Sequence, residues 1–326
     1  MSHVQITSPA ELVAAVPALL GFHPTESLVG LWTDEKAQLV CSIRFDLAMP
    51  EPMIARTLLD LIHRQEPDGR LMLVVYPADR DLPTVVRDLM DRFTGRKVPL
   101  LDVLLVADGR WWSMLCADPT CCPPEGTPLL RSISPVEVSR VTDGAPAVAD
   151  SRDEATARYR LCPDEQPSDA QLRAGAALVT GDIWKRAFVA IDLLVRLSST
   201  SVDVPADQVA VMQLLQDVQV RDIALASIID RDDRESLAAA LIDVVLRTPD
   251  ELRPRIAGAA AAASAALGDS SVRTWAMVDL AEDDSLADLV AQAMVSMVNP
   301  RELRRIFKDA VEMMREAESV AVQRFS

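Results

Sequence analysis

The chain has 326 residues, 49% of them apolar, and carries a formal net charge of −16 at pH 7. This length allows two domains, each with a hydrophobic core of its own. The acidic balance disfavours nucleic acid and anionic membrane surfaces as partners, because both attract clustered Lys and Arg, and solubility is its simplest interpretation.

Strand and helix patterns alternate over the first third of the chain. Ser8 and Pro9 predict a helix N-terminus, and Gly21 predicts the end of this helix. The elements expected after it lie at 27–32, 38–45, about 51–64, 71–76, about 82–93, 100–106 and 110–115. The Asp-Gly pair between the last two strands is a strong hairpin signal. Strand–helix–strand order implies helical crossovers, so we predict an α/β domain with a mixed, partly parallel sheet over residues 1–116.

Residues 117–167 are rich in proline and lack strong amphipathic periodicity. We interpret them as an ordered, proline-rich Trp/Cys loop that leads into a linker. Within this segment we expect a short strand near 136–141 and a helical piece near 154–159.

Residues 168–326 show helical periodicity throughout. The expected helices lie at about 169–178, 183–197, 206–214, 220–229, 234–246, 254–267, 271–281, 286–297 and 300–317. The loops between them are short, which favours antiparallel neighbours. We therefore predict an all-α C-terminal domain, either a helical bundle or a solenoid-like array.

Several segments of the chain point to one known family. They are Leu19–Pro24, Ser27–Val29, Arg110–Gly126, Val220–Asp222 and the alanine-rich Ala259–Asp284. Together they resemble an uncharacterised domain-of-unknown-function family of high-GC Gram-positive bacteria, whose central motif is Trp-Trp followed by Cys-x4-Cys-Cys-Pro. The resemblance covers most of the chain. It implies no established activity, so it assigns no catalytic residue.

Residues 262–284 also resemble part of a tetratricopeptide repeat. Gly268 and Asp269 match the turn between the paired helices of that repeat, and Asp284 matches the acidic residue near its end. The small residues of the repeat's second helix are mostly absent, and no period of about 34 residues recurs. We therefore expect a single tetratricopeptide-like helical hairpin in the C-terminal half.

Targeting signals are missing from the sequence. No run of about 18 apolar residues could span a membrane, and the N-terminus lacks the basic and apolar regions of a signal peptide. The five cysteines are an odd number and are not spaced as a disulfide framework. We predict a cytoplasmic protein with reduced thiols and no membrane association.

Three of the five cysteines lie close together in the Trp/Cys loop. Cys116, Cys121 and Cys122 could supply three of the four ligands of a tetrahedral zinc ion, with His23 or Cys162 as the fourth. The spacing differs from the usual Cys-x2-Cys pattern of structural zinc sites. Zinc is therefore one hypothesis for this loop.

Two other interpretations of the same cysteines stay open. Cys116 and Cys121 could form a redox-active disulfide, because pairing cannot be read from sequence. Alternatively, the small apolar thiols could pack beneath Trp111 or Trp112 without any chemistry.

The two adjacent tryptophans are candidates for a binding surface. Trp111 and Trp112 follow Arg110 on a predicted strand, so their side chains point to opposite faces of the sheet. We expect one of the two tryptophans to face the helices of the domain. The other tryptophan lies on the opposite face of the sheet, where it is either covered by another element or forms a pocket or partner site with Arg110.

The turn at residues 21–27 contains the only histidine with a candidate role. His23 and Glu26 could act as acid and base in a cleft. The alternative is a structural turn set by Gly21 and Pro24, in which His23 makes a hydrogen bond.

Two functions remain possible from the sequence. The first is a protein-interaction or regulatory module whose helical half binds a protein partner. Residues 301–308 form a basic, amphipathic patch that fits an exposed helix face. Residues 310–321 alternate acidic and apolar positions at helical spacing, so a homodimer through the C-terminal helices is possible. The second is an enzyme, metal-assisted if zinc is present, with its site near His23 and the loop Cys116–Cys122.

Overall fold

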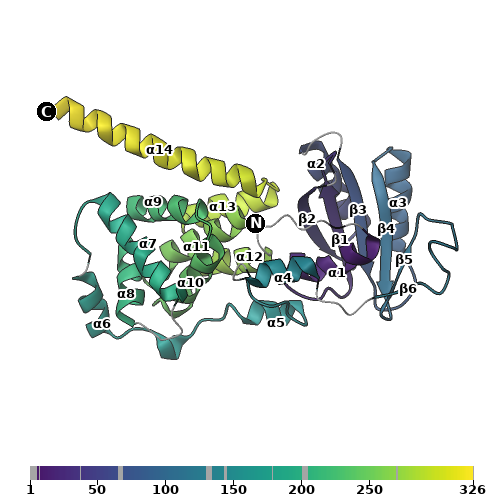
Figure 1. Ribbon diagram of the computed structural model, residues 1–326, viewed down its shortest axis with the longest axis horizontal. Coiled ribbons are helices and arrows are strands. Elements are labelled where there is room, and N and C mark those ends of the chain that lie inside the picture. The colour runs from purple at the N-terminus through teal and green to yellow at the C-terminus, as the bar shows by residue number, and fades with distance from the viewer. Residues whose placement is uncertain are drawn as a thin grey trace. The chain divides into compact units, whose positions relative to one another are not determined.

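The structure is a computed structural model, and it describes residues 6, 8–36, 38–64, 69–129, 134–142, 145–177, 179–199, 205–268 and 271–325. The chain forms two compact units (Figure 1). We call the unit of Met1–Arg140 and Ala147–Arg152 the α/β unit. The unit of Val141–Pro146 and Asp153–Ser326 is the helical unit.

The α/β unit is built on one six-stranded sheet in the order β2-β1-β3-β4-β5-β6. Its main elements are α1 (Pro9–Leu20), β1 (Ser27–Thr33), β2 (Leu39–Asp46), α2 (Glu51–Arg64), β3 (Arg70–Tyr76), α3 (Thr84–Gly95), β4 (Leu100–Ala107), β5 (Arg110–Ser113) and β6 (Thr127–Pro128). Strands β3 and β4 pair in parallel through the α3 crossover, whereas the other neighbouring strands pair antiparallel. The predicted mixed, partly parallel sheet is therefore confirmed.

The first helix begins and ends where its capping residues predict. The Ser8 side chain accepts a hydrogen bond from the Glu11 backbone N–H at 3.2 Å, and Pro9 occupies the first helical position. At the other end Gly21 has a φ of 83°, a left-handed conformation that glycine adopts without steric cost. This cap turns the chain out of the helix toward β1.

Strand β1 lies between β2 and β3 in the sheet and is buried along almost its whole length. Leu28, Val29 and Trp32 have no exposed surface, and each such side chain contributes roughly 1.5–3 kcal/mol or more through burial. Gly30 allows α2 to approach closely, because a Cβ at this position would lie only 3.0 Å from a methyl carbon of Leu58. The apolar pattern of β1 thus determines where the core of the α/β unit lies.

The prediction of a strand near 136–141 is wrong, because these residues belong to helix α4 (Pro135–Thr142). The Ser134 hydroxyl accepts a hydrogen bond from the Val136 backbone N–H at 3.2 Å, and the Ser134 carbonyl begins the helical pattern by accepting from Val138 N–H at 3.0 Å. Proline at the first helical position completes a helix start. The β-branched valines suggested a strand, but this start signal outweighs their propensity. The helical piece expected near 154–159 corresponds to α5 (Arg152–Ala157).

The helical unit contains helices at all the positions predicted from 169 onward. After the short 3₁₀ helix η1 (Pro163–Glu165), the helices are α6 (Asp169–Ala176), α7 (Ile183–Ser199), α8 (Pro205–Leu214), α9 (Val218–Ile229), α10 (Arg234–Arg247), α11 (Arg253–Leu267), α12 (Ser271–Leu280), α13 (Ser285–Val295) and α14 (Pro300–Phe325). Helix α11 is the centre of this unit, with α9, α10, α12, α13 and α14 packed around it. Its run of alanines is buried on every side, because small side chains let several neighbours approach one helix.

A buried ion pair joins helices α9 and α13 beside α11. The Asp284 carboxylate accepts hydrogen bonds from the backbone N–H groups of Leu286 (3.0 Å) and Ala287 (3.2 Å) and so caps α13. It also accepts from the Arg221 guanidinium of α9 at 3.2 Å. Gly258 of α11 makes room for this contact, since a Cβ there would lie 2.1 Å from a carboxylate oxygen of Asp284.

Helices α11 and α12 form the helical hairpin that the sequence predicts. They pack against each other, and Gly268 ends α11 with a φ of 72°. Residues 269–270, which complete the expected turn, lie outside the described residues.

Candidate functional site

The candidate site is the loop of residues 114–126, which we call the cysteine loop. It leaves the sheet after β5 and returns as β6, and β6 pairs with β5 through Arg110 opposite Pro128 and Trp111 opposite Thr127. Both ends of the loop are therefore attached to the same strand. A loop closed in this way holds its side chains close together.

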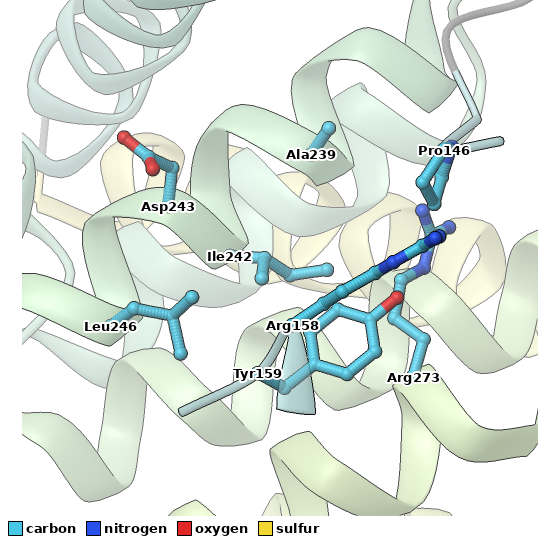
Figure 2. Close-up of a pocket in the computed structure, with 8 residues that line it drawn as sticks. All are labelled: Pro146, Arg158, Tyr159, Ala239, Ile242, Asp243, Leu246 and Arg273. Atoms are coloured by element: carbon cyan, nitrogen blue, oxygen red, sulfur yellow. The ribbon is translucent and has the colours of Figure 1, made fainter. Parts of the chain in front are cut away.

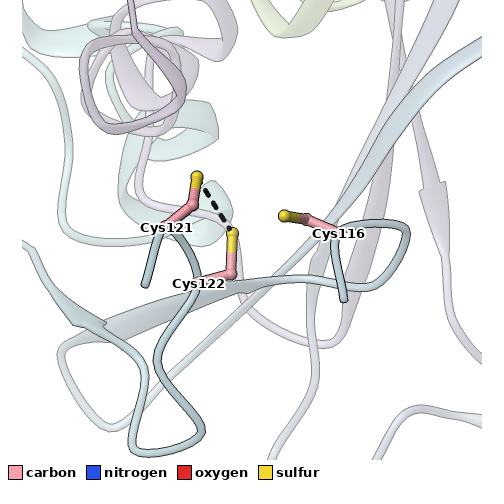
Figure 3. A group of neighbouring side chains, drawn as sticks. All are labelled: Cys116, Cys121 and Cys122. Carbon is pink, nitrogen blue, oxygen red and sulfur yellow. Dashed lines mark hydrogen bonds between the residues drawn. The ribbon is translucent and has the colours of Figure 1, made fainter. Parts of the chain in front are cut away.

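Three sulfur atoms meet inside this loop (Figure 3). The Sγ atoms of Cys116, Cys121 and Cys122 all lie within 4.8 Å of one another, and those of Cys121 and Cys122 are 3.8 Å apart. Tetrahedral zinc with Zn–S bonds of about 2.3 Å separates its sulfur ligands by roughly 3.8 Å. All three cysteines are free thiols, and their spacing is close to what a metal ion requires.

Backbone hydrogen bonds shape the part of the loop that carries two of the cysteines. The Asp118 carbonyl accepts from the N–H groups of Cys121 (3.2 Å) and Cys122 (2.8 Å). The Asp118 carboxylate accepts from the Thr120 N–H at 2.8 Å, and this contact lowers the pKa of Asp118 below its ordinary value. The turn is thus held by Asp118 from both its backbone and its side chain.

The third cysteine is positioned from the sheet. The Cys116 N–H donates to the Ser113 hydroxyl at 3.0 Å, and that hydroxyl donates to the Asp102 carboxylate of β4 at 2.8 Å. Asp102 also accepts from the backbone N–H of Val103 at 2.7 Å. A chain of hydrogen bonds therefore connects Cys116 to the interior of the strand pair.

The three thiols differ in acidity although they are neighbours. A hydrogen bond with the backbone of Asp118 is the main reason that the pKa of Cys116 is lowered, and the Cys122 side chain adds to the effect. Desolvation, together with the nearby sulfur atoms of Cys116 and Cys121, raises the pKa of Cys122 to about 12. Without a cation, ionisation of one thiol therefore opposes ionisation of the next.

The side chain of Trp112 packs against the end of the cysteine loop. Its indole N–H donates to the Pro124 carbonyl at 3.1 Å, and the guanidinium carbon of Arg80 lies 4.6 Å from the centre of its ring. Arg80 also donates to the Pro124 carbonyl at 2.6 Å. Gly126, with a φ of 79°, passes so close that a Cβ would lie 2.3 Å from the ring.

Arg110 and Trp111 also have structural contacts. The Arg110 guanidinium donates to the backbone carbonyls of Glu125 (3.4 Å) and Gly126 (2.8 Å) and so holds the return of the loop. Trp111 is buried, with 7% of its surface exposed. The sequence offered a binding surface at Arg110, Trp111 and Trp112, and that function stays a prediction.

His23 and Glu26 lie in the turn before β1, and both are exposed. The backbone holds this turn: the His23 N–H donates to the Ala149 carbonyl at 2.9 Å, and the Glu26 carbonyl accepts from Leu47 N–H at 3.0 Å. Across the described part of the chain, the group of His, Cys, Asp and Glu side chains suited to a metal consists of the three loop cysteines, without His23 or Cys162. Acid–base roles for His23 and Glu26 stay predictions.

Several residues of the site escaped prediction from sequence. Arg80 lies 32 positions before Trp112 and contacts it only because the sheet folds, so no local pattern marks it. Asp102 did carry a signal, since it is the single polar residue in an otherwise apolar strand run. Such an interruption indicates a polar group with a specific hydrogen-bond partner, here Ser113.

The helical unit has a small pocket of its own (Figure 2). Its volume is about 220 Å³, and its lining residues are Pro146, Arg158, Tyr159, Ala239, Ile242, Asp243, Leu246 and Arg273. The guanidinium groups of Arg158 and Arg273 converge beside Pro146, whereas the Asp243 carboxylate lies on the opposite side. Pockets for organic ligands usually exceed about 300 Å³, so we base no function on this one.

The fold and the site together define a class of protein: a mixed α/β unit with a three-thiol loop, followed by an all-helical unit. Within the described residues, no helix combines the length and the apolar character needed to cross a membrane. The chain belongs to the family described as Domain of unknown function (DUF4192), which it matches over residues 9–301. The expected membership of an uncharacterised family is therefore confirmed. Searches of curated proteins and of solved structures find no match.

Proposed function

We propose that the protein is a cytoplasmic regulatory protein whose cysteine loop binds a zinc ion through Cys116, Cys121 and Cys122. The observation that carries the proposal is the mutual distance of the three sulfur atoms, at most 4.8 Å. Two separate hydrogen-bond networks, one from Asp118 and one from Ser113, hold the cysteines in this arrangement. A loop that only packed its thiols would not need to turn them toward a common point.

Three thiolates leave one position of a tetrahedral zinc ion for another ligand. Cys121 is exposed, and Cys116 and Cys122 are half-buried, so water or a group from a partner can reach this position. A site with an open position suits exchange and regulation better than a closed four-cysteine site does. In the reducing cytoplasm the thiols stay available to the metal.

A protein partner for the helical unit is the second part of the proposal. Large apolar side chains are exposed on its last two helices, among them Leu289 (61%), Val295 (71%) and Met313 (69%). Surfaces of this kind bind other proteins more often than small molecules. Zinc binding by the loop would be the signal that the protein senses, and partner binding by the helices would be its response.

Native mass spectrometry and zinc titration of the full chain test the proposal. We expect one zinc ion per chain and a cobalt(II)-loaded form with thiolate charge-transfer absorption. Cys116→Ser and Cys121→Ser should each lose tight binding. Cys41→Ser and Cys162→Ser are the matched controls, because neither residue belongs to the cluster, and both should keep it.

Two results would overturn the zinc proposal. One is a metal-free protein that does not compete with a weak chelator for added zinc. The other is unchanged zinc affinity in Cys116→Ser. A mass lower by two hydrogen atoms, with two thiols of the loop missing from the count, would instead establish a disulfide within the loop.

A further inference from the structure

Helix α14 packs on the helical unit with one face only. Leu303 is buried with 7% exposure, and Phe307 and Met314 pack against the core. These residues recur at intervals of four and seven, so they form one stripe along the helix. The stripe accounts for the contacts of α14 with α9 and α11.

Further apolar side chains of the same helix lie beside this stripe and are exposed. Ile306 is 49% exposed and Met313 is 69% exposed, and Ala310 between them is also exposed. The intervals of four and three residues are those of a coiled-coil seam. All three side chains are exposed in the described part of the helical unit.

The charges of α14 are divided between its two halves. Residues 301–308 contain four basic residues and one acidic residue, a net charge of +3. Residues 309–316 contain three acidic residues and one basic residue, a net charge of −2. The change of sign lies between 308 and 309, one residue before the midpoint between Ile306 and Met313.

Basic groups are crowded at the first half of the helix. Burial, and then the positive charges of Arg234 and Arg301, lower the pKa of Arg304. The nearest acidic contacts are long: Arg305 to Glu302 is 3.8 Å and Lys308 to Asp230 is 3.9 Å. Negative charge from another chain would therefore be favourable here.

We infer that α14 pairs antiparallel with the α14 of a second copy of this chain. With the two-fold axis between residues 309 and 310, Ile306 of one copy faces Met313 of the other. The basic half of each helix then lies along the acidic half of its partner. A parallel pair would instead place like charges side by side, and a two-fold axis makes the contact close on itself as a dimer.

Sedimentation equilibrium of the full chain tests this inference, which does not depend on zinc. We expect a dimer whose dissociation constant rises at least about tenfold in Met313→Glu and also rises with salt. Leu289→Glu is the matched control, because Leu289 is an exposed apolar residue of α13, and it should leave the dissociation constant unchanged. A monomer at every concentration, or equal weakening by Leu289→Glu, would overturn the inference.

Charge-reversal variants distinguish loss of the charge match between the helices from misfolding of the variant. A variant with Arg301→Glu and Arg305→Glu, and a variant with Glu312→Arg and Glu316→Arg, should each dimerise weakly alone. Mixed together they should associate again, because each supplies the charge that the other has lost. Failure of the mixture to associate would overturn the antiparallel charge match.

Cysteine cross-linking determines the direction of the pair. An Ile306→Cys chain mixed with a Met313→Cys chain should give a mixed disulfide, identified by mass spectrometry of the linked peptides. Ile306→Cys linked efficiently to itself would show a parallel pair and contradict the inference.

Discussion

At the scale of single residues, position within one short loop decides how each cysteine behaves. A hydrogen bond with the Asp118 backbone lowers the pKa of Cys116, whereas desolvation, and then its sulfur neighbours, raise the pKa of Cys122. Cys41 lies on β2, and burial raises its pKa to about 12. Thiol chemistry in this chain therefore follows local geometry rather than residue type.

We predict a fixed order of alkylation in the metal-free protein. Iodoacetamide reacts with thiolates, so at neutral pH Cys116 should react faster than Cys122 and Cys41. As pH rises to 10, the rate at Cys116 should level off first because its pKa is lowered, whereas the rates at the other two should still rise. Quantitative peptide mass spectrometry across pH checks this order. Equal rates at Cys116 and Cys122 would contradict it.

The residue scale also shows the limit of prediction from sequence. Three cysteines within seven positions made a cluster foreseeable, because a short loop keeps them near one another. The contact of Arg80 with Trp112 was not foreseeable, because it joins distant parts of the chain, whereas Asp102 was marked only as a polar residue in an apolar strand without indicating its partner. The fourth ligand suggested at His23 or Cys162 depended on long-range folding in the same way.

At the scale of elements, capping residues and turns located most helices and hairpins correctly. Helix α9 is an example, because Asp217 accepts from the N–H groups of Gln219 (3.0 Å) and Val220 (3.4 Å) at its start. The one element assigned to the wrong type, α4, has valines that fit a strand and a Ser-Pro start that fits a helix. Local propensity alone does not decide between such signals.

Asp217 allows a prediction of pH dependence. Burial raises its pKa, but the ion pair with Arg186 at 2.7 Å and the two backbone N–H groups outweigh burial, so the pKa is lowered overall. Stability from this carboxylate is therefore present above pH 4 and is lost as pH falls through the lowered pKa. Asp217→Asn should cost up to about 1 kcal/mol at pH 7, and this cost should shrink as the pH falls through the lowered pKa. Urea unfolding at several pH values measures this difference, and a cost independent of pH would contradict the assignment.

Gly258 allows a prediction about helix packing. Gly258→Ala should destabilise the helical unit by about 1–3 kcal/mol, because the added methyl group collides with the Asp284 carboxylate that caps α13. Gly95→Ala is the control: its Cβ would meet nothing within 4 Å, so it should be neutral or slightly stabilising. Chemical denaturation of both variants measures the difference. Equal stability of the two variants would show that Asp284 moves aside at no cost.

At the scale of the whole molecule, the α/β unit and the helical unit have separate cores. The sequence predicted an α/β half followed by an all-helical half, because strand patterns stop before the proline-rich segment and helical periodicity follows it. The family match over residues 9–301 spans both units.

We predict two transitions in scanning calorimetry. Zinc at a hundred times its dissociation constant should stabilise the α/β unit by about 2.7 kcal/mol, and should raise the midpoint temperature of only one of the two transitions. Gly258→Ala should lower only the other, since Gly258 belongs to the helical unit. One transition that responds to both changes would show that the units unfold together.

The turn between β4 and β5 has a consequence for the cysteine loop. Asp108 and Gly109 both have positive φ, 51° and 71°, which suits a two-residue hairpin turn. Because side chains alternate along a strand, one extra residue in this turn would exchange the positions of Trp111 and Trp112. Trp112 would then enter the core, and the loop would lose its contact with this side chain. The length of the turn between β4 and β5 thus affects the arrangement of the three thiols, although the turn itself contains no cysteine.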